Sequence, residues 1–186
     1  SLNAESTSAY AGGLVEELTS QVTIDNQTGS VIPVSGSIEG VSGAGGLFGH
    51  YTNYKAEFDL KDYNNTATVD GTYCGGVFGV LENNKDDSAT SLSLTIKNTS
   101  NAVTLTANSG TTGNASGYFG GIAGKYTTNA LANSLILDGL TFTANANAAY
   151  SAFGGAIGIA DSASYVQTTN TVSVTASGTT SSTYFG

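Results

Sequence analysis

The chain of 186 residues has a formal net charge of −9, and all five of its basic residues are lysines. Such a chain repels nucleic acid, which is therefore not expected as a partner. Hydrophobic residues make up 39% of it, too much patterned apolar content for a disordered tail. No apolar run approaches the roughly 20 residues that span a bilayer, so membrane insertion is not expected either.

A Gly-Gly box recurs along the chain. Its first glycines stand at positions 12, 45, 75, 120, 154 and 186, which are 33, 30, 45, 34 and 32 residues apart. A period between about 20 and 50 residues indicates a solenoid, a propeller or another repeat array. The copies are residues 10–15, 44–49, 73–79, 118–124 and 153–158, and residues 184–186 begin a sixth.

A second element alternates apolar and polar residues, which is typical of a strand with one buried face. Its copies are residues 32–35, 67–70, 103–106, 140–143 and 172–175. A less regular apolar run lies between box and strand, at residues 22–24, 58–60, 92–96, 135–137 and 165–166. Two excursions, residues 82–88 and 108–114, lengthen the interval between the third and fourth boxes and have the composition of loops.

These elements predict an all-β fold, a parallel β-solenoid (β-helix) of about five coils of roughly 32 residues with three short strands per coil. The alternative is a β-propeller, which needs four antiparallel strands and a period nearer 40 residues. We expect residues 1–186 to form one solenoid domain, a segment of a longer array. Because the last coil breaks off at its own box and no polar cap is evident, we expect both ends to continue into more coils or to pair with another subunit.

The glycine pair predicts a sharp corner, with positive φ angles and close approach of neighbouring coils. The residue before each pair should then form an interior row of Ala11, Ala44, Cys74, Phe119, Phe153 and Phe185. Cys74 is the only cysteine, so it cannot form an internal disulfide. We interpret it as a small buried hydrophobic residue and not as a reactive thiol.

The boxes at residues 45–49, 75–79 and 120–124, each followed by a polar turn and a strand, resemble the GLUG-type repeats of large bacterial surface proteins. Those proteins include adhesins and the non-catalytic stalks of secreted proteases. The resemblance spans residues 10–186, although Glu16 replaces the closing glycine of the first box and Ala156 replaces a larger aliphatic residue. It implies an extracellular or cell-surface location and a structural or adhesive role as stalk, fibre or adhesin repeat. It supplies no catalytic residues.

Acidic residues 11 to 14 positions after the first three boxes could lie on one side of the solenoid. Stacked carboxylates repel unless a cation such as Ca²⁺ bridges them, so a calcium site and a set of solvated surface acids are the two interpretations, the second favoured. The residues are Asp25, Asp59, Asp86 and Asp87. A carbohydrate-active enzyme using this acidic face is the alternative to a non-enzymatic module, but we expect no enzyme and no cofactor, and His50 is expected in an exposed turn.

Outward-facing hydroxyl side chains of the alternating strands form the other candidate site. Flat rows of this kind could bind carbohydrate, such as a host or matrix glycan, or ice, although threonine is also simply a good strand residue. The row residues are Thr104, Thr106, Thr141, Thr143, Ser173 and Thr175, continued by Thr68 and Ser35 and interrupted by Asp70 and Pro33.

Overall fold

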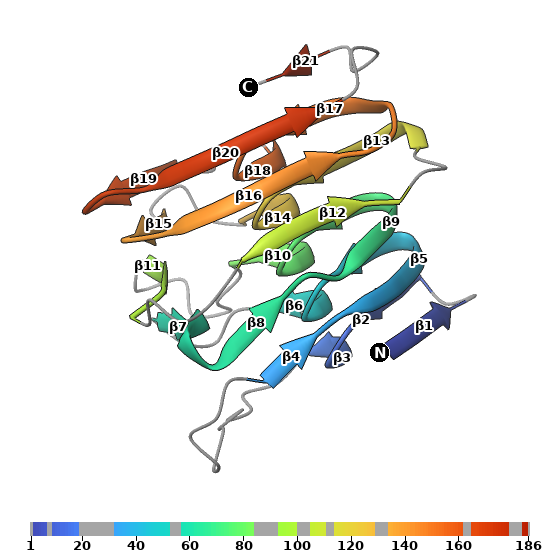
Figure 1. Ribbon diagram of the computed structural model, residues 1–186. Coiled ribbons are helices and arrows are strands. Elements are labelled where there is room, and N and C mark those ends of the chain that lie inside the picture. The colour runs from blue at the N-terminus through green and yellow to red at the C-terminus, as the bar shows by residue number, and fades with distance from the viewer. Residues whose placement is uncertain are drawn as a thin grey trace.

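A computed structural model describes residues 2–6, 9–18, 32–52, 57–83, 93–99, 105–110, 114–128, 134–161, 165–178 and 184–185. These residues form a parallel β-solenoid of about four turns, with the coils stacked from the N-terminal to the C-terminal end (Figure 1). The predicted fold is confirmed, with about four turns in place of the expected five coils. Residues 22–24, Asp25, Asp86, Asp87 and Thr104 lie outside the described residues.

Most strands lie in four parallel stacks, one strand per coil. The first stack holds β1 (Leu2–Ser6), β5 (Gly36–Gly45), β9 (Thr68–Gly75), β12 (Thr106–Ser109), β16 (Thr141–Ala146) and β20 (Ser173–Gly178). The second holds β2 (Tyr10–Gly12), the last parts of β5 and β9, β13 (Asn114–Gly120), β17 (Tyr150–Gly154) and β21 (Tyr184–Phe185). Since β5 and β9 run through both stacks, the two form one sheet.

The third and fourth stacks complete the coil. The third holds β3 (Val15–Leu18), β6 (Phe48–Thr52), β10 (Phe78–Glu82), β14 (Ala123–Thr127) and β18 (Ile157–Ala160). The fourth holds β7 (Glu57–Asp59), β11 (Ser93–Lys97), β15 (Ser134–Asp138) and β19 (Tyr165–Thr169). A short 3₁₀ helix, η1 (Leu60–Asp62), leads into β8 (Tyr63–Asn65), which pairs with β4 (Ile32–Val34).

Each Gly-Gly box forms a corner between the second and third stacks. The box that the sequence presents as one element therefore supplies two strands, one before and one after the glycines. Backbone hydrogen bonds join successive corners, as where the Gly46 amide donates to the Gly75 carbonyl at 3.0 Å. The corner is thus part of the coil-to-coil ladder and not a loop outside it.

The box glycines are required for space and not for backbone conformation. Among the described glycines only Gly36, Gly71 and Gly139 have φ in the left-handed region, so the expectation of positive φ at the boxes is wrong. A methyl group on Gly76 would instead lie 2.6 Å from the Ala107 side chain and still closer to the carbonyl of the next corner. The close approach of neighbouring coils, which was the other reason predicted for the glycine pair, is therefore confirmed.

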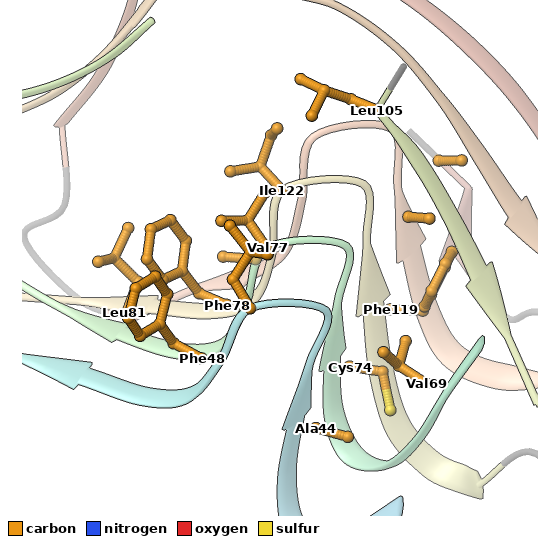
Figure 2. Close-up of a cluster of buried hydrophobic side chains, with 14 of the residues drawn as sticks. Ala44, Phe48, Val69, Cys74, Val77, Phe78, Leu81, Leu105, Phe119 and Ile122 are labelled. Carbon is orange, nitrogen blue, oxygen red and sulfur yellow. The ribbon is translucent and has the colours of Figure 1, made fainter. Parts of the chain in front are cut away.

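The core consists of interior rows in which equivalent residues of successive coils lie on one another (Figure 2). In the third stack the rings of Phe48 and Phe78 are stacked with centroids 5.5 Å apart and planes 15° apart. Burying such a ring contributes about 1.5–3 kcal/mol and a favourable ring pair about 0.5–1.5 kcal/mol more. The predicted row before the glycines is confirmed as buried for Ala11, Ala44, Cys74, Phe119 and Phe153, which follow one another in register, and the register continues to Phe185.

The predicted register of the alternating strands is right in the last coils and wrong in the first. Thr106 pairs with Thr143, which pairs with Thr175, as expected. Residues 32–35, however, do not align with residues 67–70, because Ser37 is the partner of Thr68. If a strand shifts by one residue against its neighbour, every side chain moves to the opposite face of the sheet, but a shift by four residues keeps the same side chains inside. Alternation alone therefore does not fix the register between two strands.

The coil of residues 63–75 is shifted in the same way against the next coil. Asn65, not Val69, lies beside Leu105, and Asn108 lies beside Thr68. Residues 108–109 therefore belong to β12 and not to a loop, contrary to expectation. Asn65 is buried, accepts a hydrogen bond from the Ala67 amide at 3.1 Å and donates to the Gly76 carbonyl, which ties this strand to the corner.

Replacing Gly76 with Ala should lower the free energy of unfolding by about 1–3 kcal/mol or more, because the added methyl overpacks the corner. Gly139→Asn is the matched control, since Gly139 has φ +60° and no neighbour within 4 Å of an added Cβ, and asparagine tolerates that conformation. Urea unfolding followed by circular dichroism measures both. Equal stabilities for the two variants would show that the corners are not packed as described.

Cys74 is fully buried between Ala44 and Phe119, and its thiol donates a hydrogen bond to the Gly71 carbonyl at 3.1 Å. Burial, aided by the charge of Asp70, raises the pKa of the thiol, which keeps it protonated and unreactive.

We expect Cys74 to resist thiol-labelling reagents until the protein is unfolded. Cys74→Ala should fold, since Ala44 occupies the equivalent place one coil earlier, whereas Cys74→Asp should lose several kcal/mol by burying an unpaired charge. Labelling followed by mass spectrometry, with and without denaturant, measures the accessibility. Rapid labelling of the native protein would contradict this placement.

Candidate functional site

The outer face of the first stack carries a flat set of hydroxyl groups, which we name the threonine array. Thr106, Thr143 and Thr175 form one row across three coils, and Thr141 and Ser173 form a second. Thr141, Ser173 and Thr175 are exposed and the other two are partly exposed. Neighbouring rows are spaced by about 6.6 Å along a strand and neighbouring coils by about 4.8 Å. The structure thus brings together five of the six predicted row residues, and the sixth, Thr104, lies outside the described residues.

The hydroxyls of the threonine array differ in their hydrogen bonding from the polar row beside them. Within the described residues none of the five hydroxyl groups makes a hydrogen bond, whereas Asn108, Asn145 and Ser177 in the adjacent row are bonded to one another. There Asn145 donates to the Asn108 side chain at 2.9 Å and Ser177 donates to Asn145 at 2.7 Å. This polar row holds β12, β16 and β20 in register next to the array.

The predicted continuation of the array into the earlier coils is wrong. Thr68 lies in register with Ser37 and Asn108, so it belongs to the polar row of Asn108, Asn145 and Ser177 and not to the row of Thr106. Ser35 precedes β5 and is not part of either row. The shifted register of the coil of residues 63–75, described above, is the cause.

A second polar surface lies where the second and third stacks meet at the corner, and sequence reasoning missed it. Tyr10, Gly43, Tyr73, Tyr118 and Ala152 occupy one row of the second stack. Glu17, His50, Val80, Lys125 and Ile159 occupy the facing row of the third stack. The sequence did contain a signal for this surface. A tyrosine stands two residues before the first glycine in four of the six boxes, and His50 and Lys125 directly follow a closing glycine.

The two rows pack against each other with an offset of one coil. The Tyr10 ring lies 4.7 Å from the His50 ring between centroids, and the Lys125 ammonium lies 5.3 Å from the centre of the Tyr73 ring. Tyr73 and Tyr118 stack with centroids 5.7 Å apart. Burial, followed by the charges of Glu82 and Glu17, raises the pKa of Tyr10, so its ring stays neutral at physiological pH.

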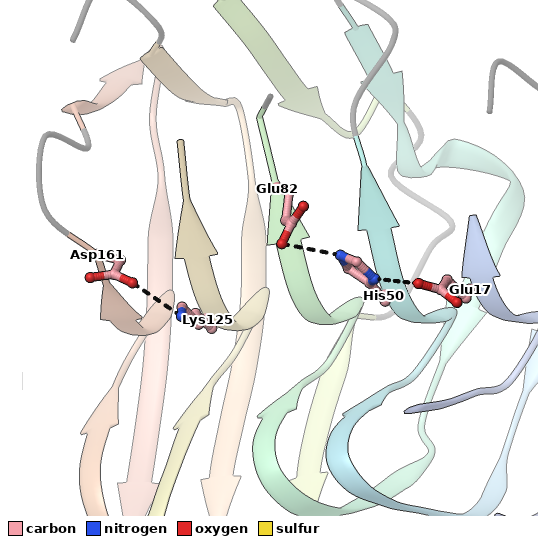
Figure 3. Close-up of polar contacts among 5 residues, drawn as sticks. All are labelled: Glu17, His50, Glu82, Lys125 and Asp161. Carbon is pink, nitrogen blue, oxygen red and sulfur yellow. Dashed lines mark hydrogen bonds and ion pairs between the residues drawn. The ribbon is translucent and has the colours of Figure 1, made fainter. Parts of the chain in front are cut away.

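Charged side chains run along the same surface (Figure 3). His50 lies between two carboxylates, with Nδ1 2.9 Å from Glu17 Oε1 and Nε2 3.4 Å from Glu82 Oε1. Lys125 Nζ lies 3.1 Å from Asp161 Oδ2. Burial lowers the pKa of Lys125, but the hydrogen bond to Asp161 and the charge of Asp161 outweigh it, so the pKa is raised.

His50 is therefore not the exposed turn residue that the sequence suggested. It lies in β6, and only 10% of its side chain is exposed, because Tyr10 and the neighbouring coils cover it. The sequence pattern places a histidine after a glycine in a polar stretch, which has the composition of a turn. The strand continues through it because the third stack pairs on both sides.

On the predicted acidic face, the structure describes Asp59 alone of the four candidates. Its carboxylate accepts hydrogen bonds from the Lys61 amide at 3.1 Å, the Thr99 amide at 3.1 Å and the Thr99 hydroxyl at 2.7 Å. Asp59 thus caps η1 and joins two coils. Among the described residues no three His, Cys, Asp or Glu side chains are grouped so as to hold a metal ion. A calcium site that includes Asp25, Asp86 or Asp87 stays a prediction.

The last coil forms one end of the solenoid within the described residues, and we name this end the C-terminal face. Among the described strands β18, β19 and β20 each pair on one side only. Val166 and Val174 continue the interior rows of Leu135 and Phe142, yet each is 39% exposed. Within the described residues these rows are thus more exposed at the C-terminal face than at Leu135 and Phe142 in the preceding coil.

No family model, curated protein or solved structure matches this chain. No helix in the described parts of the chain has the length and apolar character that crossing a membrane requires.

Proposed function

We propose that this chain is a non-enzymatic structural and adhesive module of a secreted or cell-surface bacterial protein, one that extends by parallel stacking of coils end to end. The observation that carries the proposal is the C-terminal face. Its exposed valines occupy interior rows, and among the described strands the outer edges of β18, β19 and β20 have no strand paired to them, which leaves backbone donors and acceptors for a further strand. A further coil, from flanking repeats or from another copy, satisfies both at once. The resemblance to GLUG-type repeats supports the cell-surface setting.

Charge and apolar contact act in opposite directions on this stacking. The net charge of −9 opposes the approach of two copies at low ionic strength. Raising the ionic strength to about 0.15 M shortens the screening length to about 8 Å, which leaves the short-range contact between apolar rows and strand edges. Association should therefore strengthen with salt.

Replacing both Val166 and Val174 with Lys should abolish end-to-end association, because each lysine places an unpaired charge in an interior row of the interface. The wild-type chain should at least double its apparent mass between low salt and about 0.15 M salt, and the double variant should stay monomeric. Light scattering at equal protein concentration measures this.

Val41→Lys is the matched control. Val41 is 64% exposed in β5, away from the C-terminal face, so this variant should associate like the wild type. A wild-type chain that stays monomeric at every salt concentration, or equal association of all three proteins, would contradict the proposed stacking.

A second candidate function, binding of carbohydrate, is favoured by the threonine array. Threonine is stiff at χ1, so the array presents methyl and hydroxyl groups in fixed positions and loses little entropy on binding. The array contains no charged side chain, and the acidic chain repels acidic polymers. We therefore expect an extended neutral polysaccharide as its ligand.

Replacing both Thr143 and Thr175 with Val should weaken binding to insoluble neutral polysaccharides about tenfold or more, since two hydrogen-bonding groups are lost while the side-chain shape is kept. Sedimentation with the polysaccharide measures the bound fraction. Thr127→Val in β14, which lies on a different face, is the control and should bind like the wild type. Equal binding of all variants, or no binding by the wild type, would exclude the array as a glycan site.

A further inference from the structure

Two copies of one side-chain arrangement occur on the corner surface, two coils apart. In the first, the Lys125 ammonium lies over the Tyr73 ring and pairs with Asp161 at 3.1 Å. The three residues come from three successive coils, so the arrangement joins these coils from outside the core. We name it an aromatic–cation–carboxylate triad.

The second copy consists of Tyr10, His50 and Glu82. Its members occupy the same rows as the first, since Tyr10 is related to Tyr73 through Gly43, and His50 to Lys125 through Val80. Glu82 is related to Asp161 through Thr127, since Glu82 pairs with Thr127 and Thr127 lies beside Asp161 in the next coil. The set that lies one coil further along in each row, Gly43, Val80 and Thr127, is uncharged. His50 therefore stands in the place of the lysine cation.

The surroundings of His50 fit the imidazolium form better than the neutral ring. Its two nitrogens face two carboxylates, Glu17 on β3 and Glu82 on β10, and Tyr10 on β2 covers the ring. A neutral imidazole has one N–H and can donate to one carboxylate only. The second nitrogen, Nε2, is buried and makes no hydrogen bond of good geometry within the described residues, although Glu82 Oε1 lies 3.4 Å away. A neutral ring that donates from Nδ1 to Glu17 would have no proton on Nε2 to donate to Glu82. The imidazolium donates in both directions.

We propose that His50 is a pH-sensitive clamp: in its protonated form it ties the coils of β3, β6 and β10 together, as Lys125 does permanently two coils later. The clamp requires a protonated histidine and ionised glutamates. It is therefore closed in mildly acidic solution and opens when a rise in pH removes the proton from the histidine. Protonation of Glu17 and Glu82 in more strongly acidic solution releases it again.

Thermal unfolding at about pH 5.5 and pH 8 tests the clamp with three proteins. We expect the wild type to have the higher Tm at pH 5.5, by about 2–4 °C after subtraction of the change seen in His50→Lys. His50→Lys converts the second triad into a copy of the first and should remove this component. Lys125→His should instead add a second component of the same sign, because it makes the first triad titratable. Unchanged pH dependence in His50→Lys would overturn the proposal.

A direct measurement does not depend on how the variants fold. His50 is the only histidine, so the imidazole signals of ¹⁵N-histidine-labelled protein need no assignment. At pH 5.5 the folded protein should show both nitrogens protonated with slowly exchanging protons, and one proton should be lost as the pH is raised to 8. Glu82→Gln should move the midpoint of that titration to lower pH, because a carboxylate is removed. A folded protein whose imidazole is neutral at pH 5.5, or a midpoint indifferent to Glu82→Gln, would refute the clamp.

Discussion

Each position of a coil lies directly on its equivalent in the next coil, and this parallel in-register pairing is the constraint on which the whole structure depends. It lets one hydrogen-bonded ladder run along every stack at a spacing of about 4.8 Å. It also places like side chains on like, so that Phe48 stacks on Phe78 inside while Asn108 bonds Asn145 outside. At the corners this pairing requires the box glycines, because the neighbouring coil leaves no space for a Cβ atom there.

The repeat, the fold class and the interior row through Cys74 could be predicted because they depend on period and polarity, which the sequence displays. The register of the early coils could not, because a slip of four residues buries the same apolar pattern. Buried Asn65 decides it by bonding the corner carbonyl, a contact between residues that no local pattern links.

The polar surfaces were predictable to different degrees. The array of Thr143 and Thr175 follows from strict alternation, and so it was found. The triads could not be predicted without knowing which coil each residue faces, since Tyr10 contacts His50 of the next coil and not a residue of its own coil. The role of Asp59 was missed for the same reason, because its partner Thr99 lies 40 residues away in the next coil. Side-chain chemistry between coils is visible only once the register is known.

The in-register stacking itself is tested most directly by a distance across the full set of coils. Glu17 and Ile159 occupy the same row of the third stack, four coil steps apart, and lie 142 residues apart in the chain. Spin labels at these two positions in a Cys74→Ala background can be measured by double electron–electron resonance. The account predicts a narrow distribution that corresponds to a Cα separation of about 19 Å. A broad distribution would contradict a parallel stack in this register. So would a distribution centred beyond about 30 Å, because the reach of the labels does not account for so large a distance.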